Sequence, residues 1–342
     1  MFCQIAELMT FAAPPGTGST NMSEVERLEG YLAHKWDLTN LLPITHPYRN
    51  YSLAATDDWN PSQGFPTGSG NMDTAFWIDA SDEDSWNYGS GYIDSVTDKS
   101  GNYTLHIHDD TDLWRAGTLA GKYYFHFRGN TGISTTSSGN PSNATANKQA
   151  DNGNHWAIGL VRWETITSSE DAFWHLDSHD GIPATNRDYA VESRGSSTTA
   201  GWTGKTDFGS GDISSTAGHV HNWTSGVDHN VWSIVAMYFN KTGNQIGARV
   251  NGSNAHSPIN DYDTSISTNH EVHLFRSKVG TFLKGDLAEF FTFADIPGTG
   301  GTDISFIEIA EGYLAHKWND IGIGQDVLNR LPNDHPFKSS AP

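Results

Sequence analysis

From about residue 73 the chain is a succession of short apolar runs of strand length. The Gly-, Asn-, Ser- and Thr-rich segments between these runs read as loops that join strands. The expected strands are 73–79, 103–108, 123–128, 155–163, 172–176, 189–193, 231–239, 245–250, 271–275 and 282–293. This succession predicts an all-β fold, a sandwich of two antiparallel sheets.

One helix is expected after the last strand, over about 305–318. Ser305 and Glu308 have the spacing of a capping box, so the helix should begin there. Gly312 costs about 1 kcal/mol relative to alanine in a helix, which indicates close backbone contact with another element; a glycine without a packing role is the alternative. The apolar face of this helix comprises Ile307, Ala310, Leu314 and Trp318.

The strand and helix that end this fold also occur at the start of the chain. Residues 5–36 and 287–318 agree at 20 of 32 positions without a gap. The agreement includes the run Glu-Gly-Tyr-Leu-Ala-His-Lys-Trp, at 29–36 and again at 311–318, and a Leu-Pro-x-x-His-Pro sequence follows each copy. The repeated part is therefore interpreted as the edge strand and covering helix of a domain, not as a whole domain.

Three regions follow from this repeat: an orphan strand-helix unit at 1–49, a proline-containing connector at 50–71, and the sandwich with its closing helix at 72–342. A strand without its own sheet exposes backbone donors and acceptors, so it should add to a sheet, either in the same chain or on a neighbouring copy. A piece of a longer tandem array, with Met1 internal, is the alternative. The side chains expected to carry assembly are Ile5, Leu8, Phe11, Val25, Leu28, Leu32 and Trp36.

Composition narrows the classes of function. The 12 Trp, 12 Tyr and 16 Phe can build a large core, so the chain is not disordered despite its polarity. A net charge of −20 disfavours binding to nucleic-acid phosphates. Cys3 is the only cysteine, which excludes a disulfide within the chain. No apolar run is long enough to span a membrane, and no signal-peptide pattern opens the sequence.

The order of these elements resembles the laminin-G-like branch of the concanavalin A-like lectin/glucanase superfamily. The matching pieces are Thr-Ala-Phe-Trp-Ile-Asp-Ala-Ser-Asp at 74–82, Thr-Asp-Lys-Ser-Gly-Asn at 97–102, the strand at 231–240, Arg-Val-Asn-Gly at 249–252 and Gly-Asp-Leu-Ala-Glu-Phe-Phe at 285–291. The closing helix looks like that of laminin-G-like domains in marine phage structural proteins and large bacterial surface proteins. The resemblance covers 72–338 and implies a jelly roll with the helix packed at one edge.

Catalytic residues are not apparent. Glycosidases on this fold place paired carboxylates on alternate positions of one strand, and no Glu-x-Asp-x-Glu arrangement is present. Glu164 stands alone at the end of a strand, and Glu289 is predicted to be structural. His175, Asp177, His179 and Asp180 are expected in a polar loop, with a ligand or metal site as the alternative. The protein is therefore not expected to be an enzyme.

Two kinds of binding site remain candidates. Calcium, the possible cofactor, needs clustered oxygen ligands; the candidates are Asp79, Asp82, Asp84, Asp94 and Asp98, with solvated acidic loops as the alternative. Glycans need exposed aromatic rings beside polar groups; the candidates are Trp86, Tyr88, Trp202, Trp223, His179 and Asp180, with rings covered by their own loops as the alternative. No histidine pair has zinc-site spacing, so His34 and His316 are expected to form structural hydrogen bonds.

The sequence thus favours a non-enzymatic structural or adhesive component of a surface assembly, above all a phage virion protein such as a capsid decoration or tail fibre. Its expected partners are other copies of itself, other virion or surface proteins, and glycans. A lectin module for attachment to a host or cell surface is the main alternative, and a fragment of a bacterial surface adhesin is another. A polysaccharide hydrolase or lyase is the least favoured.

Overall fold

The computed structural model of the 342-residue chain describes, apart from short gaps, residues 59–134, 154–165, 172–178, 187–193, 204–208, 220–223, 230–240, 245–254, 270–275, 283–293, 303–319 and 326–342. The chain divides into two compact units, Met1–Trp59 and Asn60–Pro342. Before Trp59, only residues 29, 32, 33 and 41–43 are described. Of these, Glu29, Leu32 and Ala33 are helical. The other residues expected to carry assembly lie outside the described part: Ile5, Leu8, Phe11, Val25, Leu28 and Trp36.

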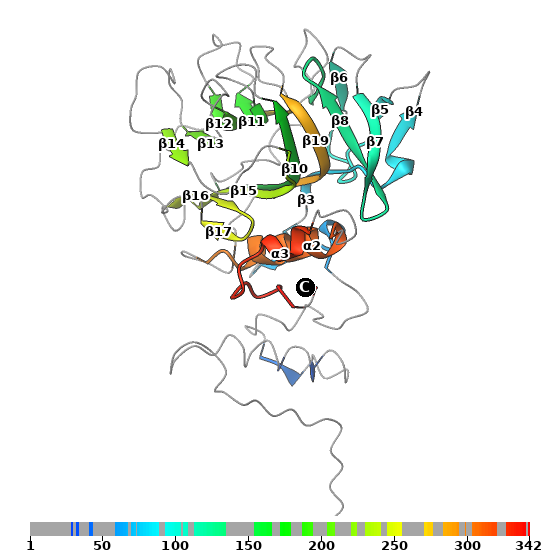
Figure 1. The fold of residues 1–342 in the computed structure, drawn as a ribbon. Coiled ribbons are helices and arrows are strands. Elements are labelled where there is room, and N and C mark those ends of the chain that lie inside the picture. The colour runs from blue at the N-terminus through cyan, green and yellow to red at the C-terminus, as the bar shows by residue number, and fades with distance from the viewer. Residues whose placement is uncertain are drawn as a thin grey trace, which may run out of the picture. The chain divides into compact units, whose positions relative to one another are not determined.

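The second unit is built on two antiparallel sheets (Figure 1). Sheet I has the order β17 (Ser253–Asn254), β16 (Gln245–Val250), β15 (Ser233–Asn240), β10 (His155–Thr165), β19 (Lys284–Phe293), β8 (Lys122–Arg128) and β7 (Leu113–Leu119), and β3 (Thr74–Asp79) also pairs with β19. Sheet II has the order β14 (Val220–Trp223), β13 (Gly204–Phe208), β12 (Arg187–Ser193), β11 (Ala172–Ser178), β18 (His270–Leu274), β9 (Gly132–Ser134) and β6 (His106–His108).

Smaller elements complete this unit. Two hairpins pair β1 (Phe65–Thr67) with β2 (Gly70–Met72) and β4 (Trp86–Tyr88) with β5 (Ile93–Val96). Short 3-10 turns are η2 (Pro61–Gln63) and η3 (Glu83–Ser85), and the α-helices are α2 (Ser305–Lys317) and α3 (Val327–Arg330). Among the residues described, no helix has both the length and the apolar character that a bilayer span requires.

The predicted sandwich is confirmed, and each of the ten expected strands coincides with an observed strand. The core lies between the two sheets, because one cluster of buried side chains draws on both. Phe127 and Phe275 stack there with ring centroids 4.1 Å apart. Other members are Val161, Trp163, Leu287 and Phe290 from sheet I and Ile133, Phe173, Trp174 and Leu274 from sheet II.

The strand that belongs to the repeat is central in its sheet, not at an edge. On one side β19 pairs with β10, from Trp156↔Phe293 onward, and on the other side it pairs with β3 and β8. The interpretation of this strand as an edge strand is therefore wrong. Removing β19 would leave three separate parts of sheet I: the strands β17, β16, β15 and β10, the pair β8 and β7, and β3.

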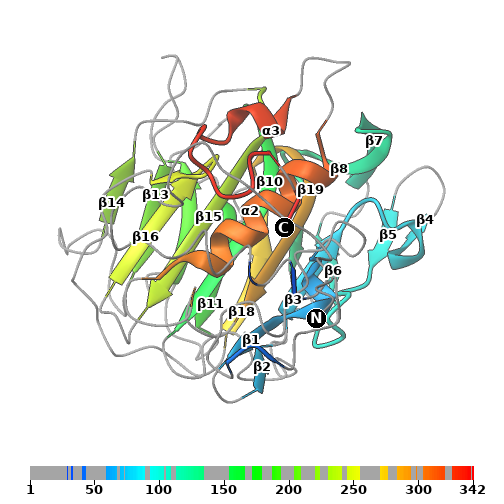
Figure 2. The ribbon, with the colours of Figure 1, turned by 90° about the horizontal axis from the view of Figure 1, so that it is seen from below.

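The closing helix also differs in place from the expectation. It lies across the middle of the outer face of sheet I, against β10 and β15, and not at an edge of the sandwich (Figure 2). All four predicted apolar-face residues are fully buried. Glu311 and Gly312 are buried as well, because the C-terminal segment around Phe337 covers the opposite side of the helix.

The helix begins at the predicted residue but is capped differently. Ser305 is its first residue, and Ile304 at the N-cap position provides no side-chain hydrogen bond. Instead, the Asp303 carboxylate accepts hydrogen bonds from the Ser305 backbone N–H at 2.9 Å and from the Ser305 hydroxyl at 3.2 Å. The capping-box prediction is wrong, because the acidic side chain two positions upstream performs that role.

Gly312 is needed for close packing, as its position in the helix indicated. A Cβ at this position would lie 2.4 Å from the Phe337 Cβ. We expect Gly312→Ala to destabilise the protein by about 1–3 kcal/mol, because overpacking outweighs the better helix propensity of alanine. Urea unfolding would measure this. In a Phe337→Gly background, which removes the Cβ that would be met, the loss should be smaller; equal losses in both backgrounds would contradict the packing explanation.

The second half of the expected connector is part of the sandwich unit. Phe65 in β1 is fully buried, with ring centroids 4.6 Å from Phe306, 5.0 Å from Phe293 and 5.5 Å from Trp156. This unit therefore begins at Asn60, not at residue 72. These rings fill one end of the space between sheet I and α2.

Candidate functional site: the interface of the closing helix

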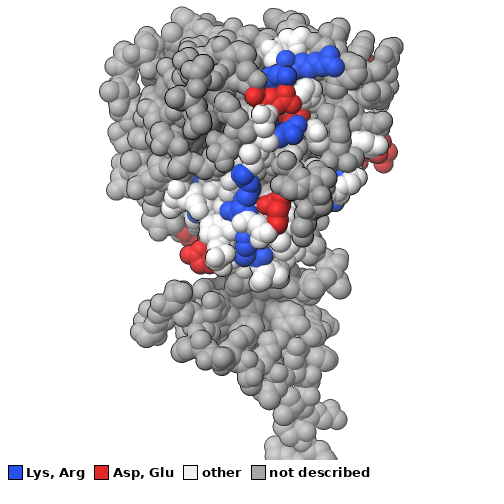
Figure 3. All heavy atoms as spheres, in the orientation of Figure 1, with Lys and Arg blue, Asp and Glu red and all other residues white. Residues whose placement is uncertain are grey.

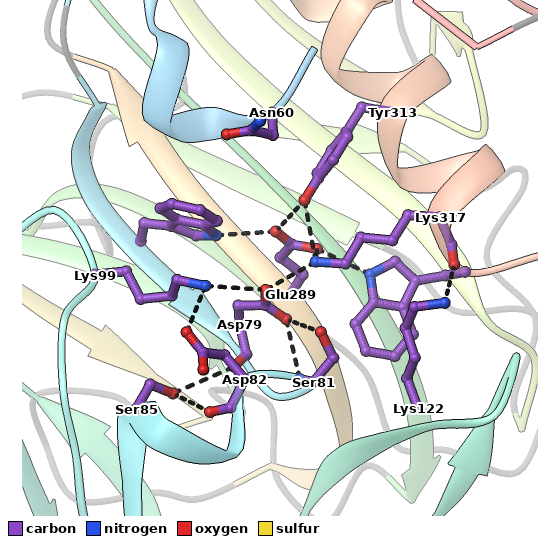
Figure 4. A network of polar contacts seen from close by, with 12 residues as sticks. Asn60, Asp79, Ser81, Asp82, Ser85, Lys99, Lys122, Glu289, Tyr313 and Lys317 are labelled. Carbon is purple, nitrogen blue, oxygen red and sulfur yellow. Dashed lines mark hydrogen bonds and ion pairs between the residues drawn. The ribbon is translucent and has the colours of Figure 1, made fainter. Parts of the chain in front are cut away.

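The centre of the helix-sheet interface is the carboxylate of Glu289 on β19, which is fully buried (Figure 4). Its Oε1 accepts hydrogen bonds from the Trp77 indole N–H and the Tyr313 hydroxyl, both at 2.9 Å. Its Oε2 accepts from Lys317 Nζ at 2.7 Å and from the Trp318 indole N–H at 2.9 Å. Three of these four donors come from the end of α2, so one buried carboxylate attaches the helix to the middle of the sheet.

Lys317 joins this carboxylate to a second one. Its ammonium lies 2.8 Å from Asp79 Oδ2 on β3 as well as 2.7 Å from Glu289 Oε2. Lys99 approaches from the other side, 3.3 Å from Asp79 and 2.7 Å from Asp82. We call this set, with Trp77, Tyr313 and Trp318, the Glu289 network.

The charges of the network depend on one another. Burial by itself would raise the pKa of Asp79, but Lys317, Ser81 and Lys99 outweigh burial and hold that pKa below its ordinary value. Burial likewise opposes the charge on Lys317, yet the two carboxylates raise the pKa of its ammonium. Burial dominates at Glu289 and raises its pKa despite the four donors. The ion pairs of the network thus favour the charged forms of Asp79 and Lys317 inside the protein, whereas burial acts against the charge of Glu289.

A second buried carboxylate belongs to the helix α2 itself. Glu311, fully buried, accepts two hydrogen bonds from Arg249 on β16, from Nε and Nη2, both at 2.9 Å. His335 Nε2 lies 3.1 Å from Glu311 Oε2, and Glu308 stands 3.9 Å from Arg249. We call these four residues the Glu311 network. Bidentate Arg–carboxylate pairs are among the strongest ion pairs in proteins.

The Glu311 carboxylate should make stability depend on pH. Burial would raise its pKa, but Arg249 and His335 outweigh burial and lower it below the ordinary value of 4.5. A lowered folded-state pKa gives stability that is present above the unfolded-state value and is lost as pH falls through the folded-state value. We therefore expect Glu311→Gln to be destabilising at about pH 7 and the difference from wild type to shrink below about pH 4.5.

Urea unfolding of both proteins at several pH values measures that difference. Asp94→Asn, which changes an exposed carboxylate, is the matched control and should show a constant small difference. A gap between Glu311→Gln and wild type that is unchanged down to about pH 3 would contradict an ionised Glu311.

The repeated run of eight residues is thus a docking sequence. Apart from its apolar members, each side chain has a partner: Glu311 binds Arg249, Tyr313, Lys317 and Trp318 bind Glu289, and His316 Nε2 lies 2.8 Å from the Phe337 carbonyl. The expected structural hydrogen bond of His316 is confirmed, and so is the structural role of Glu289. In the sequence, these contacts were indicated by charged residues that lie among the apolar positions of the predicted helix.

The expected calcium ligands are divided among other partners. Both oxygens of Asp98 accept hydrogen bonds from backbone N–H groups, including those of Trp77 and Tyr103. Asp79 and Asp82 bind lysine ammonium groups. To bind calcium, these three carboxylates would have to exchange such partners for the ion, and calcium binding by them stays a prediction. Asp84 lies in η3 and Asp94 in β5, both exposed, and calcium binding there stays a prediction.

The expected glycan ligands are only partly described. Trp86 was predicted as an exposed loop aromatic, and this is wrong: it lies in β4, is 7% exposed, and meets Phe125 edge to face in the core. Tyr88 is in β4 and Trp223 in β14. Trp202, His179 and Asp180 lie outside the described residues. The role of these five residues stays a prediction.

Polar residues expected in a loop occur instead in a strand of sheet II. His175 and Asp177 belong to β11, where His175 pairs with His273 and Asp177 pairs with Glu271 of β18. The adjacent pair Trp174↔Leu274 belongs to the core, and His273 is itself buried, at 3% exposed. The register thus brings two polar pairs together on neighbouring strands of sheet II.

Pairs of acidic residues do occur among the described residues, but each is bound to basic groups. Asp79 and Glu289 share Lys317, and Asp286 and Glu164 are paired with Arg162 and Lys284. On the face in Figure 3, the basic and acidic side chains of the described residues lie interspersed and do not gather in a region of one sign. These pairs are suited to holding strands and helix together.

No protein-family model matches this chain, and no curated protein matches it. Among solved structures, it is similar to domain 4 of AbnA, a GH43 extracellular arabinanase from Geobacillus stearothermophilus solved with arabinotriose (14% identity, 62% of this chain, 91% of that chain, TM-score 0.41). It is also similar to the botulinum neurotoxin serotype D/C VPI 5993 binding domain (13%, 70%, 52%, TM-score 0.45) and to the binding domain of Paraclostridial Mosquitocidal Protein 1 (10%, 66%, 51%, TM-score 0.42).

The chain spans about half the length of the two toxin binding domains. At identities of 10–14% and TM-scores below 0.5, the likeness carries no argument about function. The functional argument therefore rests on the residues of this chain and their contacts.

Proposed function

We propose that this protein is a non-enzymatic structural or adhesive component of a surface assembly, in which the N-terminal copy of the strand-helix unit closes another sandwich of the same kind. The observation that supports this proposal is the docking role of the repeated sequence. In the second copy, the polar side chains of that sequence bind strands of the sandwich, except His316, which contacts the C-terminal segment, and the first copy has the same residues.

The first copy of the repeat contains counterparts of some, but not all, of the residues that attach the closing helix to the sandwich. Glu7 corresponds to Glu289, and Tyr31, Lys35 and Trp36 correspond to its donors on α2. The partners that the sandwich body supplies have no counterpart within the repeat. These are Trp77, Asp79 and Arg249. Glu29, the counterpart of Glu311, is exposed, and burying it as Glu311 is buried would cost several kcal/mol unless an arginine took the place of Arg249. The first copy therefore needs a sandwich that provides equivalents of Arg249 and Asp79.

The position of β19 indicates what kind of sandwich the N-terminal copy could close. Sheet I already holds its own β19 between β10 and β3, with α2 above it, so its slot is filled. A sandwich of the same type that lacks its own final strand and helix would offer the matching slot. Such sandwiches, linked one after another, would form the array typical of phage virion fibres or of bacterial surface adhesins, and the virion is the setting that we favour.

Strand complementation tests this proposal. A fragment of residues 60–283, which lacks β19 and α2, is co-expressed with the full chain. We expect a soluble complex, because the N-terminal copy can occupy the vacant slot. The double variant Glu7→Ala/Trp36→Ala of the full chain should not rescue the fragment, whereas Leu41→Ala, at a side chain that is 73% exposed, should rescue it as wild type does.

Rescue that is equal with wild type and with the double variant would overturn the proposal, and so would the absence of any complex. The intact mass of the native polypeptide gives an independent measurement, since an array predicts further sandwiches on the same chain. Cryo-electron microscopy of virions that contain the protein would then separate the virion setting from a cell-surface one.

A second candidate function is glycan binding at sheet II. The observation in its favour is the register that pairs Asp177 of β11 with Glu271 of β18, since carboxylates are common partners of sugar hydroxyl groups. A glycan array compares wild type with Asp177→Asn/Glu271→Gln. Binding that disappears in this variant would favour the function, and an array without signal would count against it.

A further inference from the structure

A cluster of three potential metal ligands lies on sheet I, apart from the helix interface. His126 on β8, Glu164 on β10 and Asp286 on β19 each turn one ligand atom toward the others, and the three atoms lie within 4.8 Å of one another. His126 Nδ1 is 2.8 Å from Asp286 Oδ1 and 3.7 Å from Glu164 Oε1. Three neighbouring strands of one rigid sheet thus bring one imidazole and two carboxylates to a common point.

The second oxygen of each carboxylate is held by a basic side chain. Asp286 Oδ2 lies 2.5 Å from both Nε and Nη2 of Arg162, and Glu164 Oε2 lies 2.9 Å from Lys284 Nζ. Asp286 Oδ1 is directed at His126, and Glu164 Oε1 lies 3.7 Å from both His126 Nδ1 and Arg162 Nη2. Carboxylate ligands in metal sites are themselves oriented by hydrogen bonds of this kind from outside the coordination shell.

Aromatic rings fix the arginine in this arrangement. The Arg162 guanidinium lies 5.7 Å from the ring centroid of Tyr124 and 5.6 Å from that of Trp232. The two rings pack against each other at 5.1 Å. Arg162 is therefore held on one side of Asp286, and the cluster keeps its geometry without an ion.

We propose that His126, Glu164 and Asp286 form a binding site for a divalent transition-metal ion, with Zn²⁺ as the reference ion. In tetrahedral zinc sites with bonds of about 2.0–2.2 Å, neighbouring ligand atoms lie about 3.3 Å apart. The separations of 2.8 Å and 3.7 Å from His126 bracket that value. Small side-chain shifts would bring all three atoms to bonding distance, and water would take the fourth position.

The solvent accessibility of the site and the charges around it determine the affinity that we expect for the ion. The Asp286 side chain is fully buried, whereas those of His126 and Glu164 are 19% and 22% exposed, so an ion can enter from solvent. Arg162 and Lys284 already neutralise the two carboxylates, and an ion therefore adds positive charge to a neutral cluster. For this reason we expect micromolar rather than tighter affinity.

Isothermal titration of the full chain with Zn²⁺ tests the site. Because the chain has 16 histidines, the decisive quantity is the difference in stoichiometry between variants. We expect His126→Ala to lose one equivalent of bound zinc, and Glu164→Gln to weaken that equivalent by about tenfold or more. His106→Ala, which removes an imidazole on β6 in sheet II, is the matched control and should bind as wild type does.

A second measurement uses Co²⁺ as the probe, since its visible absorption reports imidazole and carboxylate ligation in the wild-type chain directly. Circular dichroism confirms that each variant is folded, and the near-isosteric Glu164→Gln decides the question if His126→Ala does not fold. The proposal is overturned if wild type binds no ion at micromolar concentrations, or if both variants bind with the stoichiometry and affinity of wild type.

Discussion

Replacing Lys317 by methionine is expected to destabilise the sandwich by about 3–5 kcal/mol, because the change leaves two buried carboxylates without their shared cation. Asp79 and Glu289 are 6% and 0% exposed, and Lys317 is the group that bridges them. Methionine retains most of the volume and the helix propensity of lysine, so the loss reports charge rather than packing. Such a loss is a large part of the total stability of an ordinary domain, about 5–15 kcal/mol.

Guanidinium-induced unfolding at neutral pH measures this loss. Lys122→Met is the matched control: among the described residues, its ammonium donates to the backbone carbonyl of Lys317, at 3.0 Å. The control should lose no more than about 1 kcal/mol, the net worth of a typical hydrogen bond. Similar losses for the two variants would show that the Glu289 network does not hold the helix in place.

Arg249→Met is expected to cost a similar amount, about 3–5 kcal/mol, since it leaves the fully buried Glu311 carboxylate without its bidentate partner. The double variant Arg249→Met/Glu311→Met should be more stable than the single one. Removing both charges avoids the cost of one unpaired buried ion, and a hydrophobic pair of similar volume often substitutes for a buried ion pair without loss.

Thermal unfolding of the two single variants and the double variant completes a double-mutant cycle. A coupling of several kcal/mol between Arg249 and Glu311 would be consistent with direct pairing in a low-dielectric interior. If the two losses simply add, the ion pair contributes nothing beyond its separate members, and the helix is held mainly by its apolar face.

The architecture could be predicted from the sequence because the long strands stand out as apolar runs of strand length between polar segments. Strands such as β10 and β15 are of this kind, and they are buried at successive positions along their length. Shorter strands gave no such signal. In β13, the sequence Gly-Lys-Thr-Asp-Phe contains more polar than apolar residues, and its strand state depends on pairing with neighbours that sequence periodicity does not reveal.

The helix interface could be predicted only in part. The repeat identified its residues, but not their partners, since Arg249 lies 62 positions from Glu311 and Trp77 lies 212 from Glu289. The burial of Trp86 could not be read from its polar neighbours, because the hairpin of β4 and β5 turns that ring inward. Likewise, His126, Glu164 and Asp286 come from three strands, and only sheet register brings them together.

The central position of β19 also determines when the sandwich can form. This strand pairs with β3, more than 200 residues earlier in the chain, so every strand from β3 to β18 is synthesised before it. Until β19 emerges from the ribosome, the parts of sheet I on either side cannot join, and contacts of such long range make folding slow. We therefore expect a nascent chain that ends before β19 to remain protease-sensitive, and protection to appear only after β19 and α2 have been synthesised.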